Sequence, residues 1–360
     1  MAGILSNEGP RQHAYDIVHA RMLDQFEQLV SELGGDPAMV AREAAVPLPS
    51  GSIGGTAEVA CAGVRALTYG DAVRLLEVAA ARLGCCDFGL RLAARQNGPG
   101  IFGPLGAAMR NARNYGEALD YAAHHVYAHS LAARVWRERV GATGQVFVGH
   151  DILISGTRGR RQAIEQILLA GHLVAMALTG GRARARQVCF RHEAMSSMRV
   201  YRRYFGCEVR FGQRADGISF DAQDLAAPIV APDPYALAQA LARIEHGFTH
   251  REPPFHARVR AVVLRQLAVG GGSCESVAGV LCMHVRTLHR RLRAEGTSIS
   301  RIKDEVRREL LGYYLEDTSL ALPVICERLG FAEHSVMTRY CRRHLGAPPS
   351  VLRARLVGAA

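Results

Sequence analysis

The chain has 360 residues, of which 49% are hydrophobic, and a formal net charge of +11. This length suits about two ordinary domains. No cationic apolar leader and no run of about 18 apolar residues occurs, which argues against a signal peptide and a membrane span and predicts a cytoplasmic protein. The nine cysteines are odd in number and form no CxxC pair, so we expect reduced, buried thiols such as Cys326 and Cys341.

Positive charge is concentrated toward the C-terminus. Residues 251–360 hold 18 basic and 10 acidic residues, a net charge of +8, whereas the rest of the chain carries +3. This distribution is expected if only the last part of the chain neutralises nucleic-acid phosphates. Lys303 is the only lysine. The planar guanidinium of arginine suits bidentate contacts to phosphate or guanine, although a GC-rich genome would give the same bias.

Helices dominate the first 130 residues. An amphipathic pattern predicts a helix over 14–34. Thr68 precedes Asp71 by three residues, and Asn114 precedes Glu117 by the same spacing. Because a side-chain oxygen at the first position of such a pair accepts from the backbone of the other, each pair predicts the N-terminus of a helix.

The pattern then changes to one typical of strands. Residues 131–140 and 145–154 are β-prone and flank a glycine-bounded turn, which predicts a hairpin. A helical pattern follows at 161–178. Three shorter β-prone segments come next, at 187–190, 208–211 and 217–220. This succession predicts a mixed fold, with an N-terminal α/β or α+β domain.

Only helical patterns occur after residue 254. The proline-containing sequence THREPP at 249–254 favours a domain boundary there. We therefore predict an N-terminal domain over 14–234, a linker over 235–254 and an all-α domain over 255–355.

The all-α domain contains two similar segments about fifty residues apart. Each has a short apolar helix, a turn, and a second helix with the pattern apolar-x-Arg-x-apolar, which is typical of a helix-turn-helix unit. The corresponding residues are Leu281 and Leu329, Met283 and Phe331, Leu288 and Met337, Arg290 and Arg339, and Leu292 and Cys341.

These segments predict a first helix-turn-helix unit at about 273–296, a linking helix at about 299–316 and a second unit at about 322–345. A helix of 18 residues spans about 27 Å at ~1.5 Å per residue. Successive major-groove segments on one face of DNA lie about 34 Å apart. One chain therefore has the dimensions to read two segments without dimerising.

The residues between the inward-facing apolar positions are predicted to contact DNA. The predicted base contacts are His284, Arg286, His289 and Arg290 in the first unit, and His334, Ser335, Thr338 and Arg339 in the second. The predicted phosphate contacts are Thr287, Arg291, Arg342 and Arg343.

The last hundred residues resemble the DNA-binding domain of the AraC/XylS family of transcription regulators. The segments that carry this resemblance are 288–298, 305–315, 325–331, Ser335, Arg339, Arg342 and 346–353. The resemblance implies a sequence-specific regulator, activator or repressor, whose partners are promoter or operator DNA and RNA polymerase. Cys282, Cys326, Met337 and Cys341 depart from the family pattern at packing or turn positions, and His284 departs at a base-reading position.

Residues 22–232 resemble the arabinose-binding-like effector domain of AraC relatives. The segments that carry this second resemblance are 32–40, 87–96, 100–121 and 201–221. It implies a domain that senses a small-molecule effector or mediates self-association as a homodimer. The name of the domain describes a related fold, and it does not imply that the ligand is arabinose.

Other interpretations remain for individual residues. Arg290 and Arg339 could form ion pairs with Asp304 or Glu327 instead of contacting DNA. His124, His125 and His129 would bind a metal only if a third ligand approached, and we favour structural roles for them. A redox pair of Cys326 and Cys341 is equally disfavoured, because both replace apolar residues.

No catalytic motif is found, so we predict that the chain is not an enzyme and has no cofactor or metal. The alternative is an enzyme, or a metal or redox sensor, in the N-terminal domain, with the DNA-binding part serving to regulate it. An RNA-binding protein is disfavoured because the sequence lacks the aromatic stacking platforms of single-strand readers.

Overall fold

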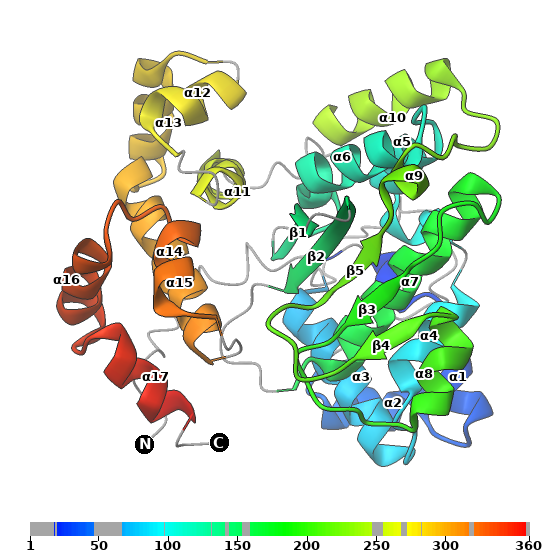
Figure 1. Ribbon diagram of the computed structural model, residues 1–360. Coiled ribbons are helices and arrows are strands. Elements are labelled where there is room, and N and C mark those ends of the chain that lie inside the picture. Colours follow the sequence, from blue (N-terminus) through cyan, green and yellow to red (C-terminus); the bar gives the residue numbers. More distant parts are fainter. Residues whose placement is uncertain are drawn as a thin grey trace. The chain divides into compact units, whose positions relative to one another are not determined.

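The computed structural model describes residues 18, 20–46, 67–96, 98–130, 132–140, 144–152, 159–246, 255–267, 272–281, 283–316 and 320–357. Among them, the elements up to His246 form one compact unit and those from Phe255 onward form another (Figure 1). The first unit combines helices with a sheet, and the second is helical. This confirms the predicted mixed fold class.

A five-stranded sheet lies at the centre of the N-terminal unit, with the strand order β1-β2-β5-β3-β4. All neighbouring strands are antiparallel except β3 and β4, which are parallel. The predicted hairpin and the three short predicted strands are confirmed. The strands are β1 (Ala133–Val140), β2 (Gln145–Ile152), β3 (Gln187–Cys189), β4 (Glu208–Arg210) and β5 (Gly217–Phe220).

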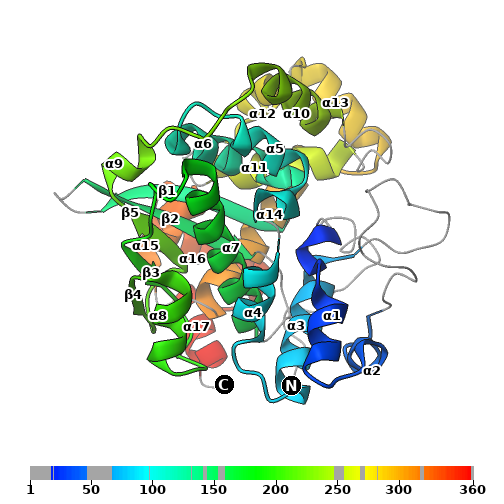
Figure 2. The same cartoon turned by 90° about the vertical axis from the view of Figure 1, so that its right-hand side faces the viewer.

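The long helix α7 (Arg161–Thr179) lies between the sheet and the helices α3 (Tyr69–Arg82) and α4 (Phe88–Arg95) (Figure 2). Among the described residues, α7 is the one helix long and apolar enough to cross a membrane, but 78% of its apolar stretch is buried inside the protein. The remaining helices of the unit are α1 (Phe26–Glu32), α2 (Pro37–Glu43), α5 (Pro104–Arg110), α6 (Tyr115–His125), α8 (Met198–Phe205), α9 (Ala222–Leu225) and α10 (Pro234–His246).

Both predicted N-caps are confirmed. The backbone N–H of Asp71 donates to Thr68 Oγ1 at 3.0 Å, and the backbone N–H of Thr68 donates to Asp71 Oδ2 at 3.1 Å. This reciprocal pair satisfies two buried donors at the start of α3. At the start of α6, the backbone N–H of Glu117 donates to Asn114 Oδ1 at 2.9 Å.

The helix predicted over 14–34 is wrong in its extent. A 3₁₀ turn at Ala20–Leu23 is separated from α1 by Gln25, which has a φ of 70°. A left-handed residue cannot continue an α-helix, so the amphipathic pattern spans a break. Residues 14–17 and 19 lie outside the described part of the chain, as does Cys282 of the first predicted turn.

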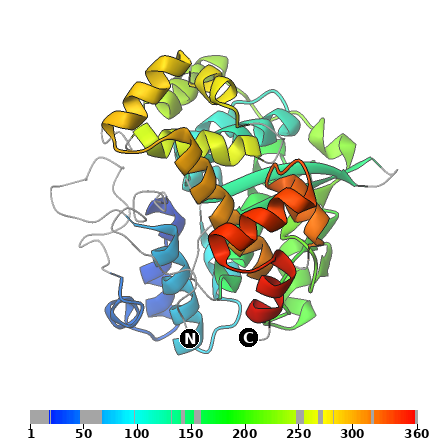
Figure 3. The ribbon, with the colours of Figure 1, turned by 90° about the vertical axis from the view of Figure 1, so that its left-hand side faces the viewer.

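The C-terminal unit packs its helices around α14, which crosses the unit from one helix pair to the other (Figure 3). Val306 and Leu311 of α14 are fully buried in its core. Its helices are α11 (Phe255–Leu267), α12 (Cys274–Val280), α13 (Val285–Ala294), α14 (Ile299–Glu316), α15 (Leu322–Arg328), α16 (His334–Leu345) and α17 (Pro349–Val357).

Part of the segment predicted as a linker is an ordered helix. Within 235–254, α10 packs against α5 through Ala240 and Ile244, which lie in a cluster with Ala108. Residues 247–254 lie outside the described part of the chain. The first half of the segment therefore belongs to the N-terminal unit, and the outer domain limits of 14 and 355 stay predictions.

Replacing Thr68 with alanine should destabilise the N-terminal unit by about 1 kcal/mol, because a buried N-cap is lost. Trp136, the only tryptophan, lies in this unit, so its fluorescence during urea unfolding reports on it alone. Thr68→Ser keeps the capping oxygen and should unfold like the natural chain. Equal unfolding midpoints for Thr68→Ala and the natural chain would show that the cap contributes nothing.

Candidate DNA-binding surface

The first helix pair, α12 and α13, is built from local backbone contacts. Ser273 Oγ accepts from the backbone N–H of Ser276 at 3.1 Å, so Ser273 is the N-cap of α12. The backbone N–H of Met283 donates to the carbonyl oxygen of Ala278 at 3.0 Å. This bond closes the end of α12 and turns the chain into α13.

The second pair, α15 and α16, repeats this geometry 48 residues later. The backbone N–H of Phe331 donates to the carbonyl oxygen of Cys326 at 3.1 Å, between the residues that correspond to Met283 and Ala278. Gly330 has a φ of 64°, a conformation that favours glycine. The repeat in the sequence is therefore also a repeat of backbone hydrogen bonds.

Each second helix is anchored by two buried side chains. Leu288 and Leu292 of α13 are 0% and 1% exposed, and Met337 and Cys341 of α16 are both 0% exposed. These are the positions predicted to face inward. Since they lie four residues apart, one stripe of each helix is fixed against the core and the opposite face is left to solvent.

The predicted contact residues lie outside these stripes. Ten of the twelve are exposed and two, Thr287 and Thr338, are half-buried. The exposed ones are His284, Arg286, His289, Arg290, Arg291, His334, Ser335, Arg339, Arg342 and Arg343. Both helices thus present basic and hydrogen-bonding side chains to solvent.

The predicted arginines at the centre of each helix are not engaged by carboxylates. Within the described ranges, neither Arg290 nor Arg339 forms an ion pair or hydrogen bond, so the pairing with Asp304 or Glu327 considered from the sequence is not formed. Unpaired, exposed guanidinium groups have no protein partner to displace before they contact an anion.

Several neighbouring side chains do have partners inside the protein. The guanidinium of Arg291 lies 5.3 Å from the ring centre of Phe255. Ser335 Oγ donates to Glu333 Oε2 at 3.0 Å, an exposed contact that water or a nucleic-acid group could replace.

The linking helix α14 contacts the entry to the first helix pair and the turn of the second. Lys303 Nζ donates to the carbonyl oxygen of Gly272, at the entry to α12, at 3.3 Å. One turn further along, Arg307 donates to the carbonyl oxygens of Leu329 and Gly330 at 3.2 and 3.0 Å. These two roles cannot be recognised from the sequence, because a contact to a backbone carbonyl requires no particular side chain in the partner residue.

The second helix of each pair, α13 or α16, forms a further hydrogen bond to the rest of the C-terminal unit. Glu295, which ends α13, accepts from the backbone N–H groups of Phe255 and His256 at 2.6 and 2.7 Å. Burial alone would raise the pKa of Glu295, but these hydrogen bonds lower it overall. Tyr340 of α16 donates to the carbonyl oxygen of Asp304 at 2.8 Å.

The histidines considered for metal binding do not converge. His124 Nδ1 lies 2.7 Å from the carbonyl oxygen of Asp120, and the His125 ring stacks on Tyr121. His129 is buried edge-on against Phe102. Among the residues that the structure describes, no group of three or more His, Cys, Asp or Glu side chains could hold a metal ion.

The two cysteines considered as a redox pair are buried free thiols. The Cys326 thiol donates to the carbonyl oxygen of Phe331 at 3.8 Å. Burial raises the pKa of both thiols, that of Cys341 to about 11. Because the thiolate is the reactive form, this environment disfavours oxidation.

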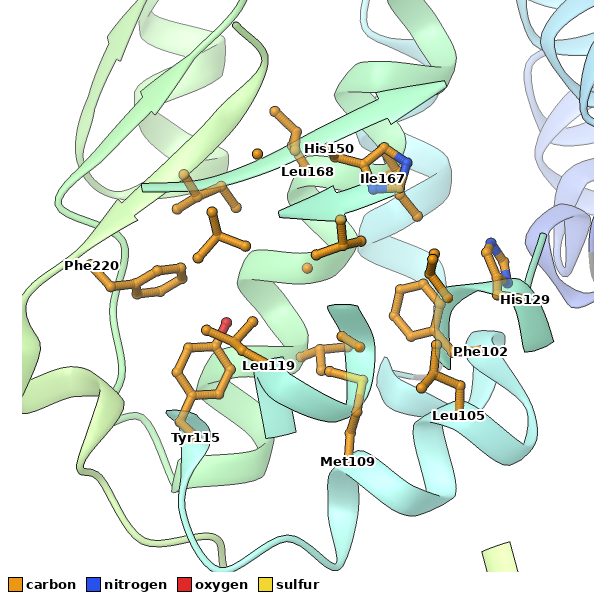
Figure 4. Close-up of a pocket in the computed structure, with 18 residues that line it drawn as sticks. Phe102, Leu105, Met109, Tyr115, Leu119, His129, His150, Ile167, Leu168 and Phe220 are labelled. Atoms are coloured by element: carbon orange, nitrogen blue, oxygen red, sulfur yellow. The ribbon is translucent and has the colours of Figure 1, made fainter. Parts of the chain in front are cut away.

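The N-terminal unit contains a partly open cavity, and the empty space in and in front of it amounts to about 690 Å³. It lies between the sheet and the helices α5, α6 and α7 (Figure 4). The lining is mostly apolar, with Tyr115, His129 and His150 as its polar side chains. This cavity cannot be recognised from the sequence, because its lining residues have the composition of an ordinary core.

Comparisons with known proteins agree with this architecture. Residues 34–229 match the family described as the arabinose-binding domain of AraC transcription regulator, N-terminal, and residues 277–355 match a helix-turn-helix domain. The chain is 33% identical to the HTH-type transcriptional regulator VirS of Mycobacterium tuberculosis over 94% of this chain and 96% of that one. It is 24% identical to the ornithine utilization regulator of Pseudomonas aeruginosa over 80% and 84% of the two chains. The crystal structure of transcriptional regulator CdpR from Pseudomonas aeruginosa aligns with a TM-score of 0.43 at 20% identity, over 88% of this chain and 96% of that one.

Replacing Arg307 with alanine should destabilise the C-terminal unit by about 1.5–3 kcal/mol, because two charge-assisted hydrogen bonds are lost. Circular dichroism during urea unfolding measures this loss. The fluorescence transition of Trp136, in the other unit, should stay in place and is the internal control. If both transitions were unchanged, the contacts of Arg307 would not be needed to hold the second turn.

Proposed function

The chain belongs to the AraC family of transcription regulators and is a DNA-binding regulator, and we propose that α13 and α16 are its two recognition helices. The observation that carries the proposal is the repeated arrangement of these helices, each with one stripe buried and an exposed face that bears unpaired arginines. Such helices enter the major groove and present side chains to base edges.

We assign the residues of this surface to two roles. One set of side chains reads bases directly, and a second set contacts phosphates. The base-reading residues are His284, Arg286, His289, Arg290, His334, Ser335, Thr338 and Arg339, and the phosphate-binding residues are Thr287, Arg291, Arg342 and Arg343.

The linking helix supports simultaneous reading of two grooves by one chain. At ~1.5 Å per residue, the 18 residues of α14 span about 27 Å, which approaches the ~34 Å between successive major-groove segments. Lys303 contacts the entry to the first helix pair from this helix, and Arg307 contacts the turn of the second pair. The proposal therefore needs no dimer for recognition of a two-part target.

For the N-terminal unit we propose a regulatory, non-catalytic role, in which a small-molecule effector binds in the cavity. The largely apolar lining of the cavity supports this role, because small-molecule sites are mostly apolar hollows with a few polar groups. Self-association as a homodimer is the second candidate, favoured by the exposed apolar side chains of Val230 and Tyr235. Because a regulator acts at a promoter, we also propose that the chain contacts RNA polymerase and is located in the cytoplasm.

Replacing Arg339 with alanine should weaken binding to a selected duplex by about 1–3 kcal/mol and relax the preference at one base position. Fluorescence anisotropy on a duplex selected from random sequences by the full-length protein measures both effects. Arg343→Ala is the matched comparison, because loss of a phosphate contact should weaken all sequences equally. An equal loss on every sequence for Arg339→Ala would refute base reading by this residue.

A fragment of residues 251–360 should be helical and should bind the same duplex in a salt-sensitive way. The physical reason is that the C-terminal unit has its own core and holds most of the positive charge. Circular dichroism and anisotropy check the two properties. A fragment that is unfolded in isolation would show that the domain boundary is wrong.

A further inference from the structure

The cavity of the N-terminal unit is formed by elements far apart in the sequence. One wall is a single face of the sheet, on which Val148 is paired with Ile218 and Val135 with His150. The opposite wall comes from α5, α6 and α7 (Figure 4). A molecule bound here would contact the sheet and all three helices at once.

Among the described residues that line the cavity, none is an aspartate, glutamate, lysine or arginine. An ion entering such a space would lose its hydration without gaining a counter-charge, and a sugar would leave most of its hydroxyl groups unpaired. The chemistry of the lining therefore does not fit the sugar named in the description of the matched family.

Two neutral polar groups stand at opposite ends of the cavity (Figure 4). At one end, Tyr115 is 2% exposed, its hydroxyl points into the cavity, and burial raises its pKa so that it stays protonated. At the other end, His150 has a buried Nε2 without a hydrogen-bond partner among the described residues. Burial lowers the pKa of His150 to about 4, so the imidazole is neutral near pH 7. His150 Nε2 is thus free to form a hydrogen bond within the described part of the unit, and the Tyr115 hydroxyl faces the cavity.

Gly171 keeps the space open on the helical side. It lies in the interior of α7, where alanine would favour the helix, and a Cβ atom added to it would meet no atom within 4 Å. The position therefore borders empty space, and it offers a way to fill the cavity without disturbing a packed neighbour.

We propose that this cavity binds an uncharged, largely apolar small molecule that carries a hydroxyl or carbonyl group for Tyr115 or His150. The inference rests on the proposed effector-sensing role of the N-terminal unit and names the chemical class of the effector. It excludes free sugars and ionised carboxylic acids as ligands of this site.

The test uses the full-length protein and the uncharged fluorescent probe N-phenyl-1-naphthylamine. We expect saturable fluorescence enhancement that is reversed by 1-decanol and not by decanoate or L-arabinose at the same concentration. Displacement by arabinose, or equal displacement by decanol and decanoate, would overturn the proposed ligand class. This comparison needs no variant, so its outcome does not depend on the folding of a mutant.

Variants then locate the probe. Gly171→Leu should abolish saturable probe binding, because the leucine side chain occupies the cavity. Gly279→Leu places the same substitution at an exposed position of α12 in the other unit and should bind the probe like the natural chain. Probe binding that persists in a folded Gly171→Leu protein would show that the probe binds elsewhere, which contradicts the proposal.

Tyr115→Phe removes the hydroxyl and keeps the ring. It should weaken displacement by 1-decanol about three- to tenfold while probe binding is retained, since a neutral hydrogen bond of ordinary strength is lost. Unchanged displacement by 1-decanol would show that Tyr115 does not contact the ligand.

Binding of the natural chain to the selected duplex is measured by anisotropy in parallel. If DNA binding is lost but the probe results are as expected, the proposed function is wrong and this inference stands. If DNA binding is intact but 1-decanol does not displace the probe, this inference is wrong and the proposed function stands.

Discussion

The polar contacts of the linking helix are the constraint on which the DNA-binding surface depends. Lys303 holds the entry to the first helix pair, and Arg307 holds the turn of the second through the carbonyl oxygens of Leu329 and Gly330. Because these contacts join both helix pairs to one helix, α14 holds α13 and α16 apart within the C-terminal unit. The exposed arginines are therefore presented at a fixed spacing, and a fixed spacing is what recognition of a two-part site requires.

The two units differ in the chemistry they present. The C-terminal unit exposes Arg290 and Arg339, which are unpaired within the described residues, and its Lys303 and Arg307 donate to backbone carbonyls. The N-terminal unit instead encloses an apolar space in which the polar groups of Tyr115 and His150 are neutral. Membership of the AraC family accounts for the combination of the two, while the identity of an effector depends on the residues that line the space. The name of the matched arabinose-binding domain therefore does not identify the chemical class of the effector.

The sequence predicted the parts of the structure that depend on local patterns. Buried positions such as Leu288 follow from helical periodicity, and the caps follow from short side chains at fixed spacing. It did not predict the break at Gln25, because a left-handed conformation at a residue other than glycine has no clear signature. The packing of Ala240 on α5 and the contacts of Arg307 involve partners distant in the chain or backbone atoms alone. The cavity was not predicted, because the apolar residues that line it have the same sequence pattern as residues of a packed core.

We propose that one chain places two recognition helices in successive major grooves of the same duplex. The most direct test is the affinity for a selected two-part site in which five base pairs are inserted between the parts. Because about 10 base pairs make one turn, the insertion moves one part to the opposite face of the DNA. We expect the affinity of the protein for the inserted site to fall to its affinity for a site with only one part intact. Unchanged affinity for the inserted site would contradict it.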